Sequence, residues 1–133
     1  MAIANNQAMQ PATLLTPAIQ ILPADTTDLK TLITAGANGA LVKEIYITTD
    51  DTSDVDVELY LNDGSTDYLL GSYTIPTLSG KSGNATIHLL SVMNYDDLKL
   101  QSTYILKIKA VATITAAKVV NIVGVAYDYV KLL

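Results

Sequence analysis

The sequence predicts an all-β protein, an antiparallel β-sandwich of about eight strands with a jelly-roll-like arrangement. Short segments rich in Val, Ile, Leu, Thr and Tyr follow one another between turn residues, which is typical of such folds. One segment, 54–62, alternates strictly between apolar and polar residues, as a strand with one buried face does. No segment has the apolar repeat of a long helix, so we expect sheet-on-sheet packing.

The chain has 133 residues, a length that fits one domain. Residues 1–16 are rich in Asn, Gln, Ala and Thr and show neither a helical nor a strand period. We interpret them as an extended N-terminal arm, which is either a frayed terminus or a segment that becomes ordered on a neighbouring subunit. Residues 17–133 then form the β-sandwich domain.

The first predicted strands of the domain are 18–22, 29–36 and 41–49. Pro23 ends the first strand, and the Gly-Ala-Asn-Gly turn follows the second. In 41–49, strict alternation places Leu41, Ile45 and Ile47 on one face, and Lys43 falls on the same face.

The segments 54–62 and 68–75 are predicted to pair as a β-hairpin. The turn between them contains Asp-Gly, a strong hairpin signal. A Gly/Ser loop, 77–84, follows and is the most exposed-looking part of the chain.

In the last part of the chain, 85–92 is predicted as a strand, 93–102 as a polar connection, and 104–114 and 118–130 as the longest strands. Both faces of the final strand are apolar. One face carries Val119, Val123, Val125 and Tyr127, and the other carries Val120, Ile122 and Ala126. A strand that is apolar on both faces belongs in a sheet centre or in a subunit interface.

Composition excludes several kinds of chemistry. The chain lacks cysteine, tryptophan, phenylalanine and arginine, and its formal net charge is −5. Disulfides and thiolate sites are therefore excluded, and neither nucleic acid nor an anionic membrane is an expected partner. The N-terminus lacks the basic and apolar regions of a signal peptide, and no apolar run reaches the roughly 18 residues of a membrane span.

No catalytic or cofactor site is expected. His88 is the only histidine, and no serine lies in a nucleophile motif. One histidine without cysteine cannot make the usual structural zinc site. The short glycine loops lack the spacing of a nucleotide-binding loop. We therefore predict that the protein is not an enzyme.

One stretch, 47–68, holds six aspartates and one glutamate. Clustered carboxylates on loops are the ligands that Ca²⁺ prefers. The weak candidates for such a site are Asp50, Asp51 and Asp54, together with Asp63 or Asp67. The alternative is that these side chains bond their own turns or form the solvated face of a strand. We favour this alternative, so no metal ion is predicted.

Three segments carry a family resemblance. They are "ILPADTTDLKTLITAGANGALVKEIYITTDDTSDVDVELYL", "DYLLGSYTIP" and "TAAKVVNIVGVAYDYV". Over roughly residues 20–128 the sequence resembles the capsid auxiliary proteins of tailed bacteriophages, which are also called decoration or cement proteins. The resemblance implies a jelly-roll-like domain that binds the outside of an icosahedral capsid, often as a homotrimer. It implies no active-site residue.

On this resemblance we expect a virion protein made in the host cytoplasm, with the major capsid protein and copies of itself as partners. The expected contact segments are 1–16, 77–84 and 93–102. Related sandwiches also occur in phage tails and head fibres. The alternative function is therefore a carbohydrate-binding or host-attachment module, in which Tyr60 and Tyr68 would stack on a sugar.

Overall fold

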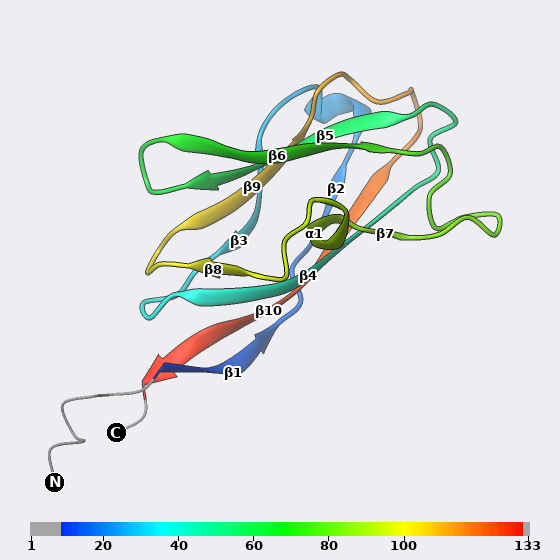
Figure 1. The fold of residues 1–133 in the computed structure, drawn as a ribbon. Helices are drawn as coiled ribbons and strands as arrows, with labels where there is room; N and C mark the ends of the chain where they lie inside the picture. Colours follow the sequence, from blue (N-terminus) through cyan, green and yellow to red (C-terminus); the bar gives the residue numbers. More distant parts are fainter. Residues whose placement is uncertain (1–8, 132–133) are drawn as a thin grey trace, which may run out of the picture.

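A computed structural model of the chain describes residues 9–131, and most of them belong to two antiparallel sheets packed face to face (Figure 1). The six-stranded sheet contains β1 (Met9–Leu15), β2 (Ala18–Ile21), β4 (Ala40–Thr49), β7 (Ile87–His88), β8 (Leu98–Leu100) and β10 (Val120–Lys131). The four-stranded sheet contains β3 (Lys30–Thr34), β5 (Val55–Asn62), β6 (Asp67–Ile75) and β9 (Ile105–Ala110). The other elements are a 3-10 turn, η2 (Pro23–Asp25), and one helical turn, α1 (Leu89–Val92). The predicted all-β sandwich is confirmed.

The strand order is that of a jelly roll. The six-stranded sheet has the order β1-β10-β4-β7, with β2 on β10 and β8 on β4, and the four-stranded sheet has the order β3-β9-β5-β6. The chain thus forms one long hairpin, in which β5 pairs with β6, β4 with β7 and β8, β3 with β9, and β1 and β2 with β10. Wrapping this hairpin places β10 beside β4 and β9 beside β5, which completes the two sheets.

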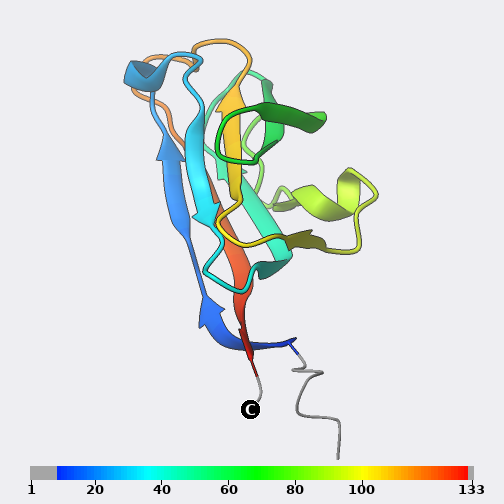
Figure 2. The same cartoon turned by 90° about the vertical axis from the view of Figure 1, so that its left-hand side faces the viewer.

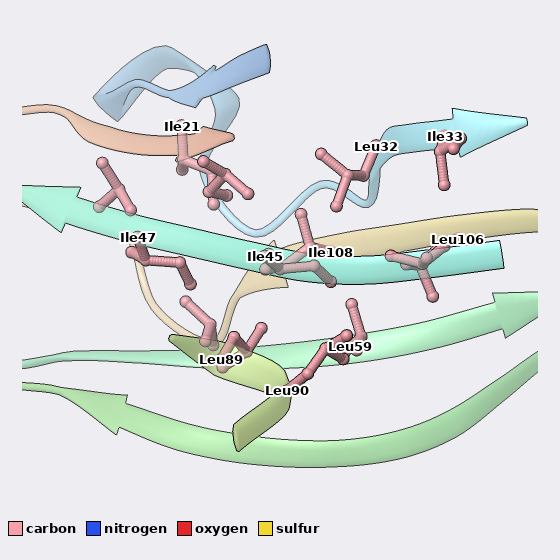
Figure 3. Packing of buried hydrophobic residues seen from close by; sticks show 14 of the residues in the cluster. Ile21, Leu32, Ile33, Ile45, Ile47, Leu59, Leu89, Leu90, Leu106 and Ile108 are labelled. Carbon is pink, nitrogen blue, oxygen red and sulfur yellow. The ribbon is translucent and has the colours of Figure 1, made fainter. Parts of the chain in front are cut away.

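A single apolar core lies between the sheets (Figure 3). Ile45 and Ile47 of β4 face Leu59 of β5 and Ile108 of β9, and all four side chains are fully buried. Burying one such side chain contributes roughly 1.5–3 kcal/mol relative to leaving it in water. The alternation of apolar residues along each strand therefore decides which face of each sheet turns inward.

β10 occupies the centre of the six-stranded sheet, which is one of the two locations that its two apolar faces predict. One edge of β10 bonds to β4, and the other bonds first to β2 and then to β1. Its pairing with β4 ends at Asp128, whereas its pairing with β1 continues to Lys131. The ends of β1 and β10 therefore extend past β4 as a two-stranded ribbon (Figures 1 and 2).

The prediction of an N-terminal arm over 1–16 is wrong for residues 9–15. They form β1, which pairs with β10 of the same chain, while residues 1–8 lie outside the described residues. Pro11 lies beside an irregularity in this pairing, and edge strands and bulges are the places where a sheet accepts proline. The strand forms because it can pair with an edge of β10, more than a hundred residues away. A pairing over such a distance leaves no periodic pattern in the local sequence.

Two further predictions are wrong between 85 and 102. Only Ile87–His88 of the predicted strand 85–92 is extended, and the chain then turns into α1. Leu89 and Leu90 are both fully buried, which a strand with one inner face does not allow for neighbouring residues. The polar connection 93–102 contains β8, and this strand of three residues is too short for its alternation to be recognised.

The predicted faces of β4 are correct only after Lys43. Glu44 pairs with Val125 and Val42 pairs with Ala126, so Lys43 is an extra residue opposite no partner. Such a bulge shifts the alternation by one position. Consequently Val42 is buried together with Ile45, and Leu41 turns to the outer face with Tyr127.

Candidate interaction surface

Asp51 is a structural carboxylate in the turn after β4. Its side chain is almost fully buried and accepts hydrogen bonds from the Ser53 amide (2.9 Å), the Thr115 amide (3.0 Å) and the Thr115 hydroxyl (2.7 Å). Burial alone raises the pKa of the Asp51 carboxyl, but these hydrogen bonds and the nearby Lys118 outweigh it and lower the pKa below its ordinary value. Asp51 thus ties the β4–β5 turn to the β9–β10 loop.

The other two calcium candidates hold different segments. Asp50 accepts a hydrogen bond from the Val119 amide at 2.8 Å, and Asp54 accepts one from the Thr77 amide at 3.1 Å. Within residues 9–131, no three His, Asp or Glu side chains are grouped so that they could hold a metal ion. The three carboxylates Asp50, Asp51 and Asp54 do not meet, and each bonds a separate stretch of backbone.

The remaining acidic residues of the hairpin turn are also bound locally. Asp63 accepts hydrogen bonds from the amides of Ser65 and Thr66, and these bonds lower the pKa of its carboxyl. Asp67 accepts a hydrogen bond from the Asn62 amide group at 2.7 Å. These bonds fix the β5–β6 turn, which agrees with the interpretation of the sequence as turn chemistry.

Tyr60 and Tyr68 do not form a common aromatic platform. Tyr60 pairs with Leu69, whereas Tyr68 pairs with Leu61, so the two tyrosines point to opposite faces of the four-stranded sheet. The Tyr60 hydroxyl donates a hydrogen bond to Glu58 at 2.9 Å, and this bond raises the Tyr60 pKa. The Lys109 ammonium lies 5.9 Å from the centroid of the same ring. This arrangement offers no flat surface on which both rings could stack on one sugar.

His88 lies on the outer side of the six-stranded sheet, opposite Tyr46. The two rings are tilted by 34° with centroids 5.0 Å apart. The buried Nε2 atom of His88 has no hydrogen-bond partner among the described residues. The histidine ring is therefore packed against the ring of Tyr46.

The outer surface of the four-stranded sheet, which we call the polar face, is mainly hydrophilic. It consists of Thr31, Asp56, Glu58, Tyr60, Leu69, Ser72, Thr74, Lys107 and Lys109. Glu58 forms an ion pair with Lys109 at 3.6 Å, and Asp56 accepts a hydrogen bond from the Thr74 hydroxyl. Leu69 and Val111 are exposed apolar residues on this side of the sheet.

The outer surface of the six-stranded sheet, which we call the apolar face, has the opposite character. Its apolar part consists of Leu14, Ala18, Leu41, Tyr46, His88, Val123, Val125 and Tyr127. Beyond Val123 the same outer surface is polar, with Gln20, Thr48 and Asn121 joined by hydrogen bonds. Residues that pair directly share a face. Tyr127 therefore lies between Leu14 and Leu41, and Val123 lies between Ala18 and Tyr46.

Much of the apolar face is open to solvent. Leu14 is 57% exposed and Val123 is 41% exposed, and Tyr46, Val125 and Tyr127 are partly exposed. Charged residues interrupt this surface. Glu44 pairs with Val125, Lys99 pairs with Leu41, and the exposed bulge residue Lys43 forms an ion pair with Asp97. A contiguous exposed apolar surface with few charges is typical of a protein–protein contact.

The sequence identified only part of this surface. The apolar outer side of the last strand named Val123, Val125 and Tyr127 in advance. Leu14 and His88 were missed, because only the topology brings β1 and β7 onto the same sheet face. The sequence feature that pointed to this surface was the apolar character of both faces of the last strand.

The loop 77–84 is anchored at its base and exposed at its tip. The Ser79 carbonyl accepts a hydrogen bond from the Thr49 amide, and the Leu78 amide donates one to the Asp51 carbonyl. Gly80 has a left-handed backbone (φ +77°), and a Cβ there would lie 2.5 Å from Thr48. Residues 81–84 are exposed. The tip of the loop therefore projects from one end of the sandwich, while hydrogen bonds hold its base (Figure 1).

Comparison with known proteins adds no family. No protein-family model matches the sequence, and no curated protein matches it either. Between residues 9 and 131, no helix has both the length and the apolar character needed to cross a membrane. The geometry of the two faces therefore carries the functional argument.

Proposed function

We propose that the protein is a structural, non-enzymatic virion component that binds the outside of a tailed-phage capsid and associates with copies of itself through the apolar face. The apolar face is the observation that carries this proposal, because isolated domains rarely leave such a surface uncovered. The jelly-roll topology and the sequence resemblance to capsid decoration proteins support the same function.

A second copy is the occupant that the charges favour. The polar face carries Asp56 and Glu58, so it suits contact with water better than contact with another apolar surface. The apolar face carries the acidic residue Glu44 beside Val125 and the basic residue Lys99 beside Leu41. Copies packed through this face can pair these opposite charges. We propose a homotrimer whose apolar faces turn towards the threefold axis.

The capsid contacts are assigned to the projecting loop 77–84 and to the segment 93–102. The loop is braced at its base, so little conformational entropy is lost when its tip binds. Several loops presented by one oligomer bind a repeating capsid surface by avidity. Residues 1–8 precede β1 and are a third candidate for this contact.

The oligomer part of the proposal is tested by native mass measurement. We expect the wild-type chain to be a trimer and Val123→Asp to be a monomer, because the new carboxylate would be buried without a partner. Ser72→Asp places the same charge on the polar face and serves as the matched control. A wild-type chain that stays monomeric at high concentration, or equal effects of both variants, would overturn this part.

The capsid part is tested by co-sedimentation with expanded capsids of the phage that encodes the chain. Ser82→Glu alters the tip of loop 77–84, while Ser65→Glu makes the same change in the β5–β6 turn. We expect only Ser82→Glu to weaken binding. Failure of the wild-type chain to sediment with capsids would contradict the capsid assignment, and equal binding of the two variants would contradict the role of the loop. Deletion of residues 1–8 leaves β1 intact and tests that segment separately.

A further inference from the structure

One edge of β2 faces away from β10. The Gly124 amide donates to the Pro17 carbonyl at 2.8 Å, and hydrogen-bonded pairs alternate along an antiparallel ladder. Ile19 and Ile21 therefore bond to β10, whereas Gln20 and Leu22 direct their backbone groups to the opposite edge. Such an edge can accept a strand from another chain.

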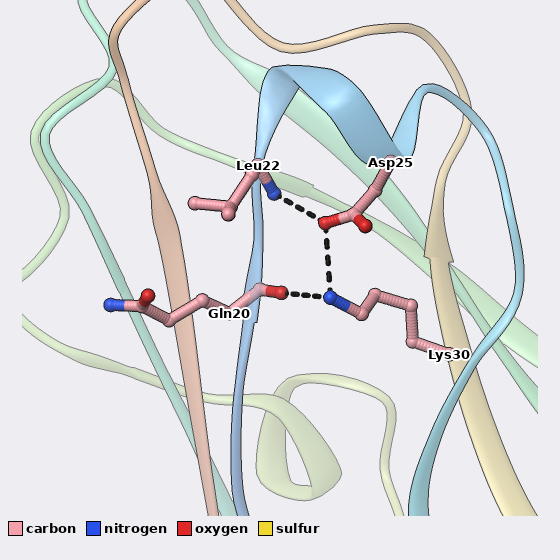
Figure 4. A network of polar contacts seen from close by, with 4 residues as sticks. All are labelled: Gln20, Leu22, Asp25 and Lys30. Atoms are coloured by element: carbon pink, nitrogen blue, oxygen red, sulfur yellow. Dashed lines mark hydrogen bonds and ion pairs between the residues drawn. The ribbon is translucent and has the colours of Figure 1, made fainter.

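Two side chains occupy this edge (Figure 4). The Lys30 ammonium donates to the Gln20 carbonyl at 2.5 Å, and the Asp25 carboxylate accepts from the Leu22 amide at 2.7 Å. Lys30 and Asp25 also form an ion pair at 3.0 Å. Lys30 belongs to β3 of the four-stranded sheet and Asp25 to η2, so the pair closes the gap between the two sheets.

The two bonded backbone groups are consecutive along the edge. A residue of an added parallel strand bonds to the carbonyl of one residue and to the amide of the residue two positions further on. Lys30 and Asp25 make these same two bonds to Gln20 and Leu22. A shallow groove lined by Ile19, Leu22 and Val123 runs beside this edge, so space for an added strand exists once the bonds open.

One edge of the four-stranded sheet, strand β6, is protected in a different way. β6 carries a bulge at Leu70, and the Leu70 carbonyl accepts a hydrogen bond from the Tyr95 hydroxyl at 2.9 Å. Bulges are a common means of preventing strand addition. β2 has no register shift in its pairing with β10, and its protection comes from the charged pair.

We infer that Asp25 and Lys30 form an edge cap that blocks strand addition at β2 by a second copy of the chain. This inference goes beyond the proposed function. It predicts that self-association is restricted to the apolar face because the neighbouring edge is already bonded. Removal of the cap opens a second mode of association, in which β2 edges of two copies pair.

Lys30→Met is the direct test. Methionine retains the unbranched apolar stem and removes the ammonium group. Lys43→Met is the matched control, since Lys43 is also a partly exposed lysine in an ion pair, with Asp97 at 3.9 Å. In a Tyr127→Asp background, which blocks the apolar face away from the β2 groove, we expect Lys30→Met to strengthen self-association by roughly tenfold or more, because an edge carbonyl loses its charged donor. Lys43→Met should leave it unchanged. Equal association of the two variants would overturn the inference.

A cross-linking experiment locates the new contact. The chain has no cysteine, so Gln20→Cys supplies one thiol on β2. With a short bis-maleimide, we expect cross-linked dimers only when Lys30→Met is also present. Absence of these dimers in a folded Lys30→Met protein would contradict edge pairing. Asp25→Ala opens the same edge from the Leu22 side and provides a second variant if Lys30→Met fails to fold.

Discussion

The two outer faces of this sandwich follow the same strand alternation and yet have opposite characters. On the four-stranded sheet, acidic residues of β5 meet hydroxyl groups of β6 and lysines of β9. On the six-stranded sheet, valines and tyrosines of β10 meet Tyr46 and Leu41 of β4. Alternation therefore creates an outer face in each sheet, but it does not determine whether that face is solvated.

The difference separates two roles of the acid-rich stretch 47–68. Asp56 and Glu58 make the polar face hydrophilic, whereas Asp50 and Asp51 hold loops at one end of the sandwich through hydrogen bonds. On the apolar face, the carboxylate of Glu44 lies beside Val125. We propose that solvation and self-association depend on different sheets of the same fold.

The largest expected effect is on the free energy of unfolding, and it distinguishes a carboxylate that holds loops from one on the polar face. Asp51→Ala should lower the free energy of unfolding by about 2–4 kcal/mol, because it leaves buried donors of Ser53 and Thr115 without an acceptor. Asp56→Ala, on the polar face, should change it by less than about 1 kcal/mol. Urea unfolding followed by circular dichroism measures both variants, and a similar loss for the two would contradict the distinction.

A second pair of variants compares tyrosines on the two faces. Tyr127→Ser removes aromatic area from the apolar face and should weaken self-association about tenfold, which corresponds to about 1.4 kcal/mol. Tyr60→Ser makes the same change on the polar face and should leave association within about twofold of wild type. Sedimentation equilibrium gives both constants. Weaker association for Tyr60→Ser alone would assign the contact to the other sheet.

A smaller effect concerns the charge inside the apolar face. Glu44→Gln should change self-association by about threefold, and the direction is informative. Tighter association would mean that Glu44 is desolvated without a partner, which contradicts the proposed pairing with Lys99 of a second copy. We expect weaker association, because this pairing is lost. Glu58→Gln on the polar face is the control and should leave the constant unchanged.

The smallest effect is the dependence of stability on pH. The pKa of Asp51 is lower in the folded chain than its ordinary value of about 3.9. Its ionised form therefore stabilises the fold above that value, and this contribution is lost as the pH falls through the lower, folded pKa. Unfolding measured from about pH 6 to about pH 3 should show a difference between wild type and Asp51→Asn that shrinks at the acid end. A difference that stays constant would contradict this linkage.

The hairpin of β5 and β6 and the central place of β10 were predictable because their signals are local. Asp-Gly between alternating segments specifies a turn, and two apolar faces specify neighbours on both sides. The bulge at Lys43 and the helical turn at Leu89 were not predictable. Each interrupts an alternation that the sequence alone continues.

The sequence by itself determined the fold class, the hairpin and the solvated strand of acidic residues, because side-chain period and turn chemistry act between near neighbours. The tertiary structure alone decided that residues 9–15 are a strand and that Asp50, Asp51 and Asp54 separate. It also decided that Lys30 reaches across to β2. These features depend on pairing between segments far apart in the chain, and in a jelly roll every sheet is built from such pairs.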